Sequence, residues 1–174
     1  MSNVRGLCAL TPVAEGREAA LRAHLRALPP GPRSPLIRVP GTHYARWSIV
    51  RLESRDGWPI ETEPPYLLFA AEFDGEREPY TRRLCQTLGY DAHDVWMHCA
   101  GYPGPSPDAL AAFLLAHHVE PGYSVAAYPD ATVDEVRAAF ALRERLADFL
   151  VRAGSLEGEA LQRAWLARFR GGDH

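Results

Sequence analysis

The sequence predicts an α+β protein that consists of a βαββαβ sheet and a helical extension. Strand-like and helix-like patterns alternate in that order over roughly the first hundred residues. The strand-like segments are apolar or mixed on both faces, so we expect both faces of the sheet to be covered. The last part of the chain has apolar residues at helical spacing. A length of 174 residues with 47% hydrophobic and 24% charged residues suits one folded domain with an extension.

The first half of the predicted sheet contains two strands and one helix. An apolar strand is predicted over residues 4–12, and an amphipathic helix with leucines at helical spacing over 16–28. The run Pro-Pro-Gly-Pro ends this helix, because proline lacks the backbone N–H that a helix needs. A second strand, over 42–53, carries His, Tyr, Arg and Trp together. The polar, proline-containing residues 54–65 then form a loop to the next strand.

The second half of the predicted sheet repeats the alternation. A third strand covers residues 66–73, and a helix over 76–88 is closed by Gly89 as its C-cap. A fourth strand is predicted over 94–102. The order β-α-β-β-α-β is the ferredoxin-like arrangement, which we assign to a core domain over residues 1–104.

Residues 105–174 are predicted to form a helical extension with a short strand, packed on the core. The first helix runs over 106–117 and begins with serine as N-cap and proline in its first turn. A short apolar strand follows over 124–128. A capping box opens a long helix over 132–152, and a last amphipathic helix covers 156–169. These helices and the short strand would cover the second face of the sheet.

Three segments resemble the dimeric α+β barrel group of ferredoxin-like proteins, including uncharacterised bacterial members. They are Thr-His-Tyr-Ala-Arg-Trp at 42–47, the strand ending in Phe-Asp-Gly at 66–75, and His-Cys-Ala-Gly-Tyr-Pro-Gly at 98–104. The likeness covers roughly residues 4–130. Members of this group pair two sheets face to face, in a dimer or between tandem domains. They bind a small molecule, or haem in some branches, between sheet and helices. The resemblance therefore implies a homodimer with a small-molecule pocket, and it does not define the chemistry.

The candidate catalytic residues are His43, Arg46 and His98. On a regular strand His43 and Arg46 face opposite sides, so they line one pocket only if a bulge intervenes. Arg46 either forms a buried ion pair with Glu72 or clamps a carboxylate or activates peroxide. His98 is either a hydrogen-bonded core residue or a general acid–base group that shares a pocket with His43.

His117 and His118 are candidate cofactor ligands at the end of a predicted helix. Imidazoles are favourable at the negative end of a helix, which is the simpler interpretation. The alternative is that one of them is an axial ligand of haem. The cofactor is therefore predicted to be either none or haem.

Composition narrows the partners and the compartment. A net charge of −3 and the absence of lysine argue against nucleic-acid binding and against Schiff-base chemistry. The three cysteines, Cys8, Cys85 and Cys99, have no metal-ligand spacing and suit reduced thiols of a cytoplasmic protein. No apolar run has the length of a membrane span, and the N-terminal residues lack a signal-peptide pattern.

These patterns favour a small-molecule enzyme of secondary or oxidative metabolism. Its reaction would be cofactor-free proton transfer, such as cyclisation or isomerisation, or a haem-dependent oxidation by an oxidoreductase. The alternative is a non-catalytic module that binds a small molecule or a protein partner through the open sheet or the last helix.

Overall fold

The computed structural model describes residues 4–51, 64–123 and 125–170. Most of the predicted loop before the third strand therefore lies outside the described residues. The chain divides into two compact units, residues 1–133 and 134–174. The predicted division into a core domain over 1–104 and an extension over 105–174 stays a prediction.

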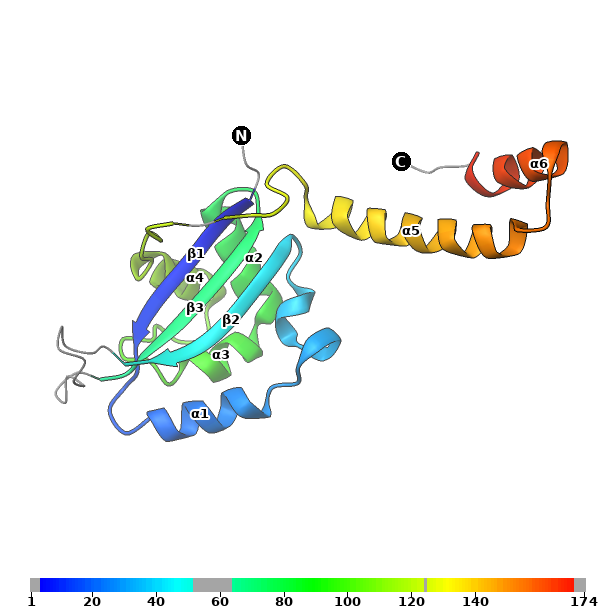
Figure 1. Cartoon of the computed structure of the whole chain (residues 1–174). Coiled ribbons are helices and arrows are strands. Elements are labelled where there is room, and N and C mark those ends of the chain that lie inside the picture. Colours follow the sequence, from blue (N-terminus) through cyan, green and yellow to red (C-terminus); the bar gives the residue numbers. More distant parts are fainter. Residues whose placement is uncertain (1–3, 52–63, 124, 171–174) are drawn as a thin grey trace. The chain divides into compact units, whose positions relative to one another are not determined.

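The first unit contains one three-stranded antiparallel sheet, with strands β1 (Val4–Pro12), β2 (Thr42–Val50) and β3 (Tyr66–Asp74). The strand order is β1-β3-β2, so β3 lies in the middle and runs antiparallel to both neighbours (Figure 1). The first three predicted strands are thereby confirmed, except that residues 52 and 53 of the second lie outside the described residues. The strands β1 and β3 alternate between more and less buried residues, as expected of a sheet with one face in the core.

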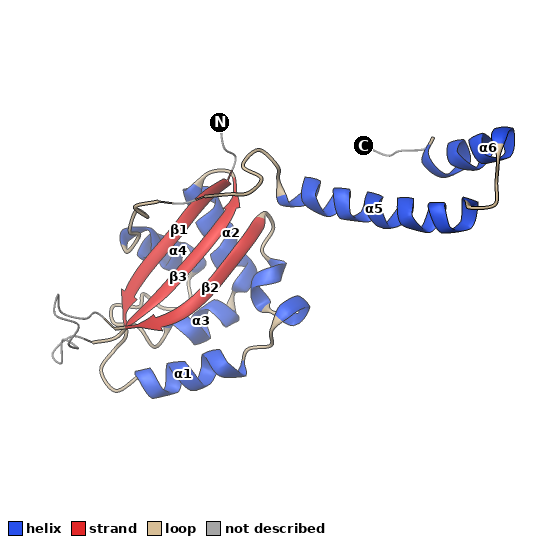
Figure 2. Cartoon of the chain, in the orientation of Figure 1, coloured by secondary structure: helices blue, strands red, loops and turns tan. Residues whose placement is uncertain are grey.

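Four helices pack on one face of this sheet: α1 (Glu18–Ala27), α2 (Arg77–Leu88), α3 (Tyr90–Trp96) and α4 (Pro107–Ala116). Figure 2 shows α2, α3 and α4 behind the three strands. Ser106 caps α4, since its side chain accepts a hydrogen bond from the N–H of Ala109. The three helices predicted over these parts of the first unit are confirmed, and α3 is additional.

The core lies between the sheet and these helices. Trp47, Phe69 and Trp96 form an aromatic cluster with ring centroids 5.5–5.8 Å apart. Phe73 stacks on Tyr80 at the other end, with 3.7 Å between ring centroids. The apolar face of β3 predicted from its odd-numbered residues is the face that meets the helices.

The fourth strand predicted over 94–102 is wrong. The chain forms α3 as far as Trp96 and then turns. Gly89, with φ of 52°, ends α2 and lets the next helix begin at once. The buried apolar residues that follow recur at spacings of three and four, which is helical and not alternating; they are Ala92, Val95, Trp96 and Cys99. The structure is therefore an α+β fold without the complete ferredoxin-like sheet.

The outer edge of β1 is covered by two short segments in place of a fourth strand. Residues 117–119 bond to it through Leu10 N–H to His117 O at 3.0 Å and Val119 N–H to Cys8 O at 2.8 Å. Near the end of β1, the N–H of Ala100 donates to Pro12 O at 2.8 Å. These bonds satisfy backbone groups that would otherwise leave an open sheet edge. The short strand predicted over 124–128 is also wrong for the described residues 125–128, which form a bend.

The second unit is a helical hairpin. It contains nearly all of α5 (Val133–Ala153) and the whole of α6 (Gly158–Phe169), which confirms the two predicted helices. Phe149 of α5 meets Trp165 and Phe169 of α6, with ring centroids 5.4 and 5.5 Å away. With these two, the described part of the chain holds six α-helices.

Candidate functional site on the open face of the sheet

The face of the sheet that points away from the helices is not covered by any described helix of the first unit (Figure 1). We call it the open face. Its side chains are half-buried or exposed. Their neighbours in β1 and β3 are mostly buried in the core, and those in β2 that face the helices are half-buried. The prediction that both faces are covered therefore does not hold for the described residues of the first unit.

The open face has a polar half and an apolar half. The register places Gly6, Glu72 and Tyr44 in one cross-strand row, and Cys8, Ala70 and Arg46 in the next. The two rows beyond them are mainly apolar, with one serine; they hold Leu10, Leu68 and Ser48, then Pro12, Tyr66 and Val50. All three strands thus contribute chemically active side chains to the polar half.

A bulge in β2 brings His43 to this face. The register shifts between Thr42 and Tyr44, so His43 is the extra residue. Thr42 faces the helices, where its hydroxyl lies 3.0 Å from the Tyr80 hydroxyl. His43 lies on the other side, with its Nε2 2.7 Å from Oδ1 of Asp74. The bulge predicted as the condition for His43 and Arg46 to share a face is present.

Asp74 orients His43. The other carboxylate oxygen of Asp74, Oδ2, accepts a hydrogen bond from the N–H of Val133 at 2.9 Å. The carboxylate is therefore held between two partners. When the imidazole is neutral and Nε2–H donates to Asp74, Nδ1 carries a lone pair that can accept a proton.

Glu72 is the second titratable group of the polar half. Both of its carboxylate oxygens lie 3.6 Å from the position that a Cβ on Gly6 would occupy, which is an ordinary van der Waals distance. Burial raises the pKa of the Glu72 carboxyl, and the nearby charge of His43 lowers it in part. Among the described residues, Arg46 makes no ion pair with Glu72, so the predicted buried pair is wrong.

The raised pKa of Glu72 predicts a pH dependence of stability. As pH rises above 4.5, the carboxyl of the unfolded chain ionises first while the native state keeps its proton. The free energy of unfolding of the wild type should therefore fall, relative to Glu72→Gln, as pH rises from acid toward neutral. Urea denaturation across this range measures both proteins. Parallel profiles would contradict the prediction.

Cys8 and Arg46 are cross-strand neighbours through Ala70. Burial raises the pKa of the Cys8 thiol most, Arg46 lowers it, and Glu72 raises it again. The thiol is therefore protonated at neutral pH, which does not suit a nucleophile. Arg46 is exposed on the open face, where its guanidinium is accessible to an anion.

His98 lies on the other side of the sheet, among the helices. It is 8% exposed, and its Nδ1 has no hydrogen-bond partner among the described residues. Burial lowers the pKa of His98, as do the charges of Arg17 and His24, while Asp94 raises it. His43 and His98 therefore do not meet in one pocket, because the sheet separates them.

The lowered pKa of His98 predicts a loss of stability in acid. Below pH 6.5 the unfolded chain takes up a proton that the native state resists. The free energy of unfolding therefore decreases as the pH is lowered. The replacement His98→Gln should flatten this slope, since glutamine keeps a polar group without titrating. Denaturation curves on both sides of pH 6.5 measure it, with His24→Gln as a comparison. An unchanged slope in His98→Gln would exclude this residue as its cause.

His117 and His118 lie at the edge of β1. The ring Nδ1 of His117 donates to Phe113 O at 2.8 Å. Nδ1 of His118 lies 3.1 Å from Cys8 N and 3.2 Å from Cys8 O, and its Nε2 lies 3.2 Å from Oε1 of Glu120. Nδ1 of both rings is thus hydrogen-bonded, to Phe113 O in His117 and to the backbone of Cys8 in His118. A haem ligand at either residue stays a prediction, and we assign no step to haem.

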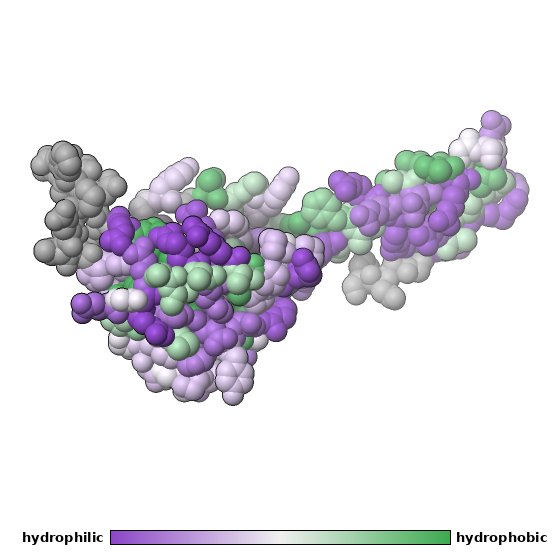
Figure 3. Space-filling model, turned by 90° about the horizontal axis from the view of Figure 1, so that it is seen from below, coloured by the Kyte–Doolittle hydropathy of each residue, from purple (hydrophilic) through white to green (hydrophobic). Residues whose placement is uncertain are grey.

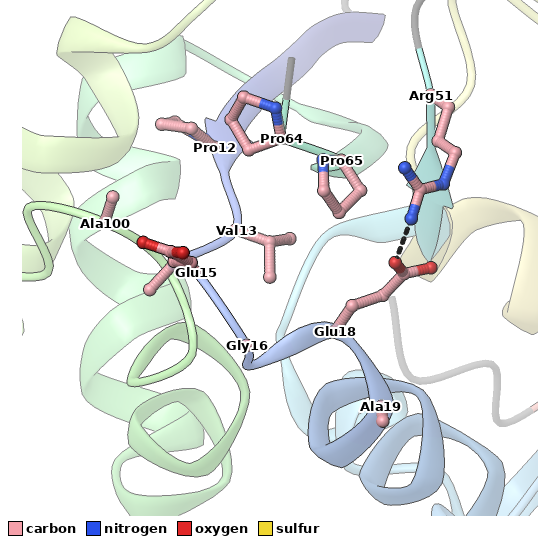
Figure 4. A pocket seen from close by; sticks show the side chains of 11 residues that line it. Pro12, Val13, Glu15, Gly16, Glu18, Ala19, Arg51, Pro64, Pro65 and Ala100 are labelled. Atoms are coloured by element: carbon pink, nitrogen blue, oxygen red, sulfur yellow. Dashed lines mark hydrogen bonds and ion pairs between the residues drawn. The ribbon is translucent and has the colours of Figure 1, made fainter. Parts of the chain in front are cut away.

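A hollow of about 760 Å³ lies at the end of β1 and is open to solvent (Figure 4). Its acidic residue Glu18 pairs with Arg51 across the hollow and with Arg22 on the same helix. The hydrogen bond from Arg22 is the main cause that lowers the pKa of Glu18. None of the predicted site residues lines this hollow. Its walls at Arg51 and Pro64 adjoin residues 52–63, outside the described residues.

Two of the important residues were not predicted as site residues. The sequence indicates only that Asp74 follows the third predicted strand and that Cys8 is a reduced thiol. The signal for both was the alternation of the strands, because even-numbered residues of β1 and β3 share the open face. The bulge that adds His43 to them has no signal in the sequence.

The described fold and face define an α+β protein with a three-stranded antiparallel sheet and a polar, titratable cluster on its open face. Comparisons with protein-family models, with curated proteins and with solved structures find no match. No described helix combines the length and the apolar character needed to cross a membrane. The described residues also contain no cluster of three metal-ligating side chains.

Proposed function

We propose that the chain is a homodimeric small-molecule enzyme of the α+β barrel type that performs cofactor-free proton transfer. The observation that supports it is the cluster of His43, Arg46 and Glu72 on one half of an otherwise apolar open face. A perturbed carboxyl beside an oriented imidazole is a typical arrangement at functional sites. Residues 117–119, which run beside β1 where a fourth strand would lie, support the barrel type of fold.

In this proposal each polar residue has a distinct role. His43, oriented by Asp74, removes a proton from the substrate through Nδ1, the ring nitrogen that does not face Asp74. Glu72, whose raised pKa favours the protonated form, returns a proton to another atom of the substrate. Arg46 binds a carboxylate or an enolate oxygen of the substrate with its planar fork of N–H groups. The net reaction is an isomerisation or cyclisation, which needs no oxidant.

The second copy completes the site in this proposal. The apolar half, with Leu10 and Leu68, would pack against the same half of a second sheet. Pairing of the sheets would exclude water from the polar half, where charged hydrogen bonds then become stronger. The open face of a single chain offers no such enclosure.

Binding of small aromatic carboxylates tests the role of Arg46. Benzoate, phenylacetate and salicylate are mixed with the full chain and observed by ligand-detected NMR. We expect weak binding that Arg46→Gln reduces by about ten- to a hundredfold, as for the loss of a hydrogen bond to a charged group. The replacement Arg5→Gln, at an exposed ion pair with Glu76, is the matched control and should bind as the wild type does. Equal binding by both variants, or none by the wild type, would count against the proposal.

The alternative is a non-catalytic binding or partner module. It is supported by the bond of Asp74 to Val133, because the His43–Asp74 pair then serves to hold the chain after residue 128 against the sheet. In that case Asp74→Asn lowers the melting temperature, while no carboxylate probe distinguishes Arg46→Gln from the wild type. Binding of the carboxylate probes to the wild type and to Arg46→Gln therefore distinguishes the two functions.

A further inference from the structure

The α5–α6 hairpin is too small to bury its own apolar side chains. The second unit has about forty residues, and chains of this size rarely form an adequate core alone. Among its described residues, only Phe149 and Ala153 are buried. An isolated helix as short as α6 is marginal in water, so its stability must come from packing.

Several of the apolar side chains that remain exposed, from both helices, border one groove. The groove has a volume of about 540 Å³ and lies between α5 and α6. Its apolar walls include Leu150, which is 60% exposed, Trp165, which is 44% exposed, and the leucines Leu161 and Leu166. Figure 3 shows apolar side chains, coloured green, at the surface of this helical unit. An exposed groove of this kind indicates an interaction surface.

The charge of the hairpin favours a second copy over a nucleic acid or an anionic membrane. Residues 134–174 contain seven arginines and seven acidic residues, so their formal net charge is zero. Two copies therefore meet without net repulsion, and the unit has no excess of positive charge that would attract phosphate groups. Several of these charges are already paired along the helices, as in Arg163 with Glu159.

We infer that the α5–α6 hairpin pairs with the hairpin of a second copy of the chain to form a four-helix bundle. Leu150 of each copy enters the groove of the other, beside Trp165, in a symmetric contact. Four helices enclose a central core that two helices lack, which supplies the missing packing. This pairing is independent of the proposed function, because it uses none of the residues of the open face.

Sedimentation velocity of full-length variants tests the pairing. The replacement Leu68→Asp is present in every variant, so that any pairing through the open face is removed. We expect Leu68→Asp alone to sediment as a dimer, and the addition of Leu150→Glu and Leu166→Glu to raise its dissociation constant at least a hundredfold. The matched control adds Val151→Glu instead, at a side chain that is 84% exposed and does not line the groove. This control should remain dimeric.

Three outcomes would overturn the inference. They are a monomeric Leu68→Asp protein, a dimer that survives both glutamates in the groove, or a control that dissociates as readily as the groove variant. Far-UV circular dichroism on dilution gives a second readout, because the hairpin should lose helicity as the dimer dissociates. Failure of the proposed function is recognised separately, by the carboxylate probes.

Discussion

Replacing Trp96 by alanine is expected to reduce the free energy of unfolding of the first unit by about 3–5 kcal/mol, the cost typical of removing a buried aromatic side chain. Trp96 is fully buried and meets the rings of Trp47 and Phe69 edge to face, at 5.8 and 5.5 Å. Its indole N–H has no hydrogen-bond partner among the described residues, so the loss comes from packing. Urea denaturation followed by circular dichroism measures the change.

Two further variants give this prediction its controls. Tyr90 is on the same helix but 81% exposed, so Tyr90→Ala should change stability by about 0.5 kcal/mol or less. Trp96→Phe keeps an aromatic ring and should recover much of the loss. If Trp96→Ala cost no more than Tyr90→Ala, the placement of α3 against the sheet would be wrong.

Leu68→Asp is expected to separate two paired sheets and to abolish binding of carboxylate probes. Leu68 lies in the middle of the apolar half of the open face, between Leu10 and Ser48. A carboxylate buried there by a second copy would lack a partner, which costs several kcal/mol. We expect binding of the probes to weaken at least a hundredfold, a change of about 2.7 kcal/mol. The fold of the single chain should persist, because Leu68 is only half-buried in it.

The rate at which the Cys8 thiol is alkylated measures directly whether the two sheets have separated. Cys8 lies on the open face, whereas burial raises the pKa of Cys85 to about 12 and that of Cys99 to about 11, which keeps these two unreactive. Alkylation by a maleimide should therefore be at least ten times faster in Leu68→Asp than in the wild type, a factor of ten corresponding to about 1.4 kcal/mol. Cys8→Ser removes the reacting thiol, and Tyr90→Asp controls for an added charge elsewhere. Equal rates in Leu68→Asp and the wild type would show that nothing covers the open face.

Local patterns were sufficient to predict most elements. Three strands and five helices follow from the spacing of apolar residues and from end signals such as Ser106 and Gly89. The error at 94–102 arose because a short apolar run suits a strand or a buried helix equally well. The burial of Val95 and the contact of Trp96 with Phe69 of the sheet decide between them.

The candidate site was predictable in part. The residue types on β2 were identified from the sequence, and the polar cluster around His43 and Arg46 includes both. Its partners Asp74 and Glu72 come from β3, and the register that brings them close depends on pairing across the sheet. Conversely, His98 was grouped with His43 although the sheet lies between them. The pairing of β2 with β3 and the position of His98 both depend on contacts between distant segments. The spacing of residues along the chain therefore cannot predict either of them.

The amino-acid sequence by itself determined the class of fold, the positions of nearly all helices and strands, and a chemically mixed strand that carries His43 and Arg46. These properties depend on residues within a few positions of one another, so they are readable from periodicity. Only the tertiary structure decided that β1 has its edge closed by residues 117–119, that a bulge turns His43 toward Asp74, and that one sheet face stays open. Those properties arise from contacts between segments far apart in the chain, whose geometry depends on how the whole unit packs.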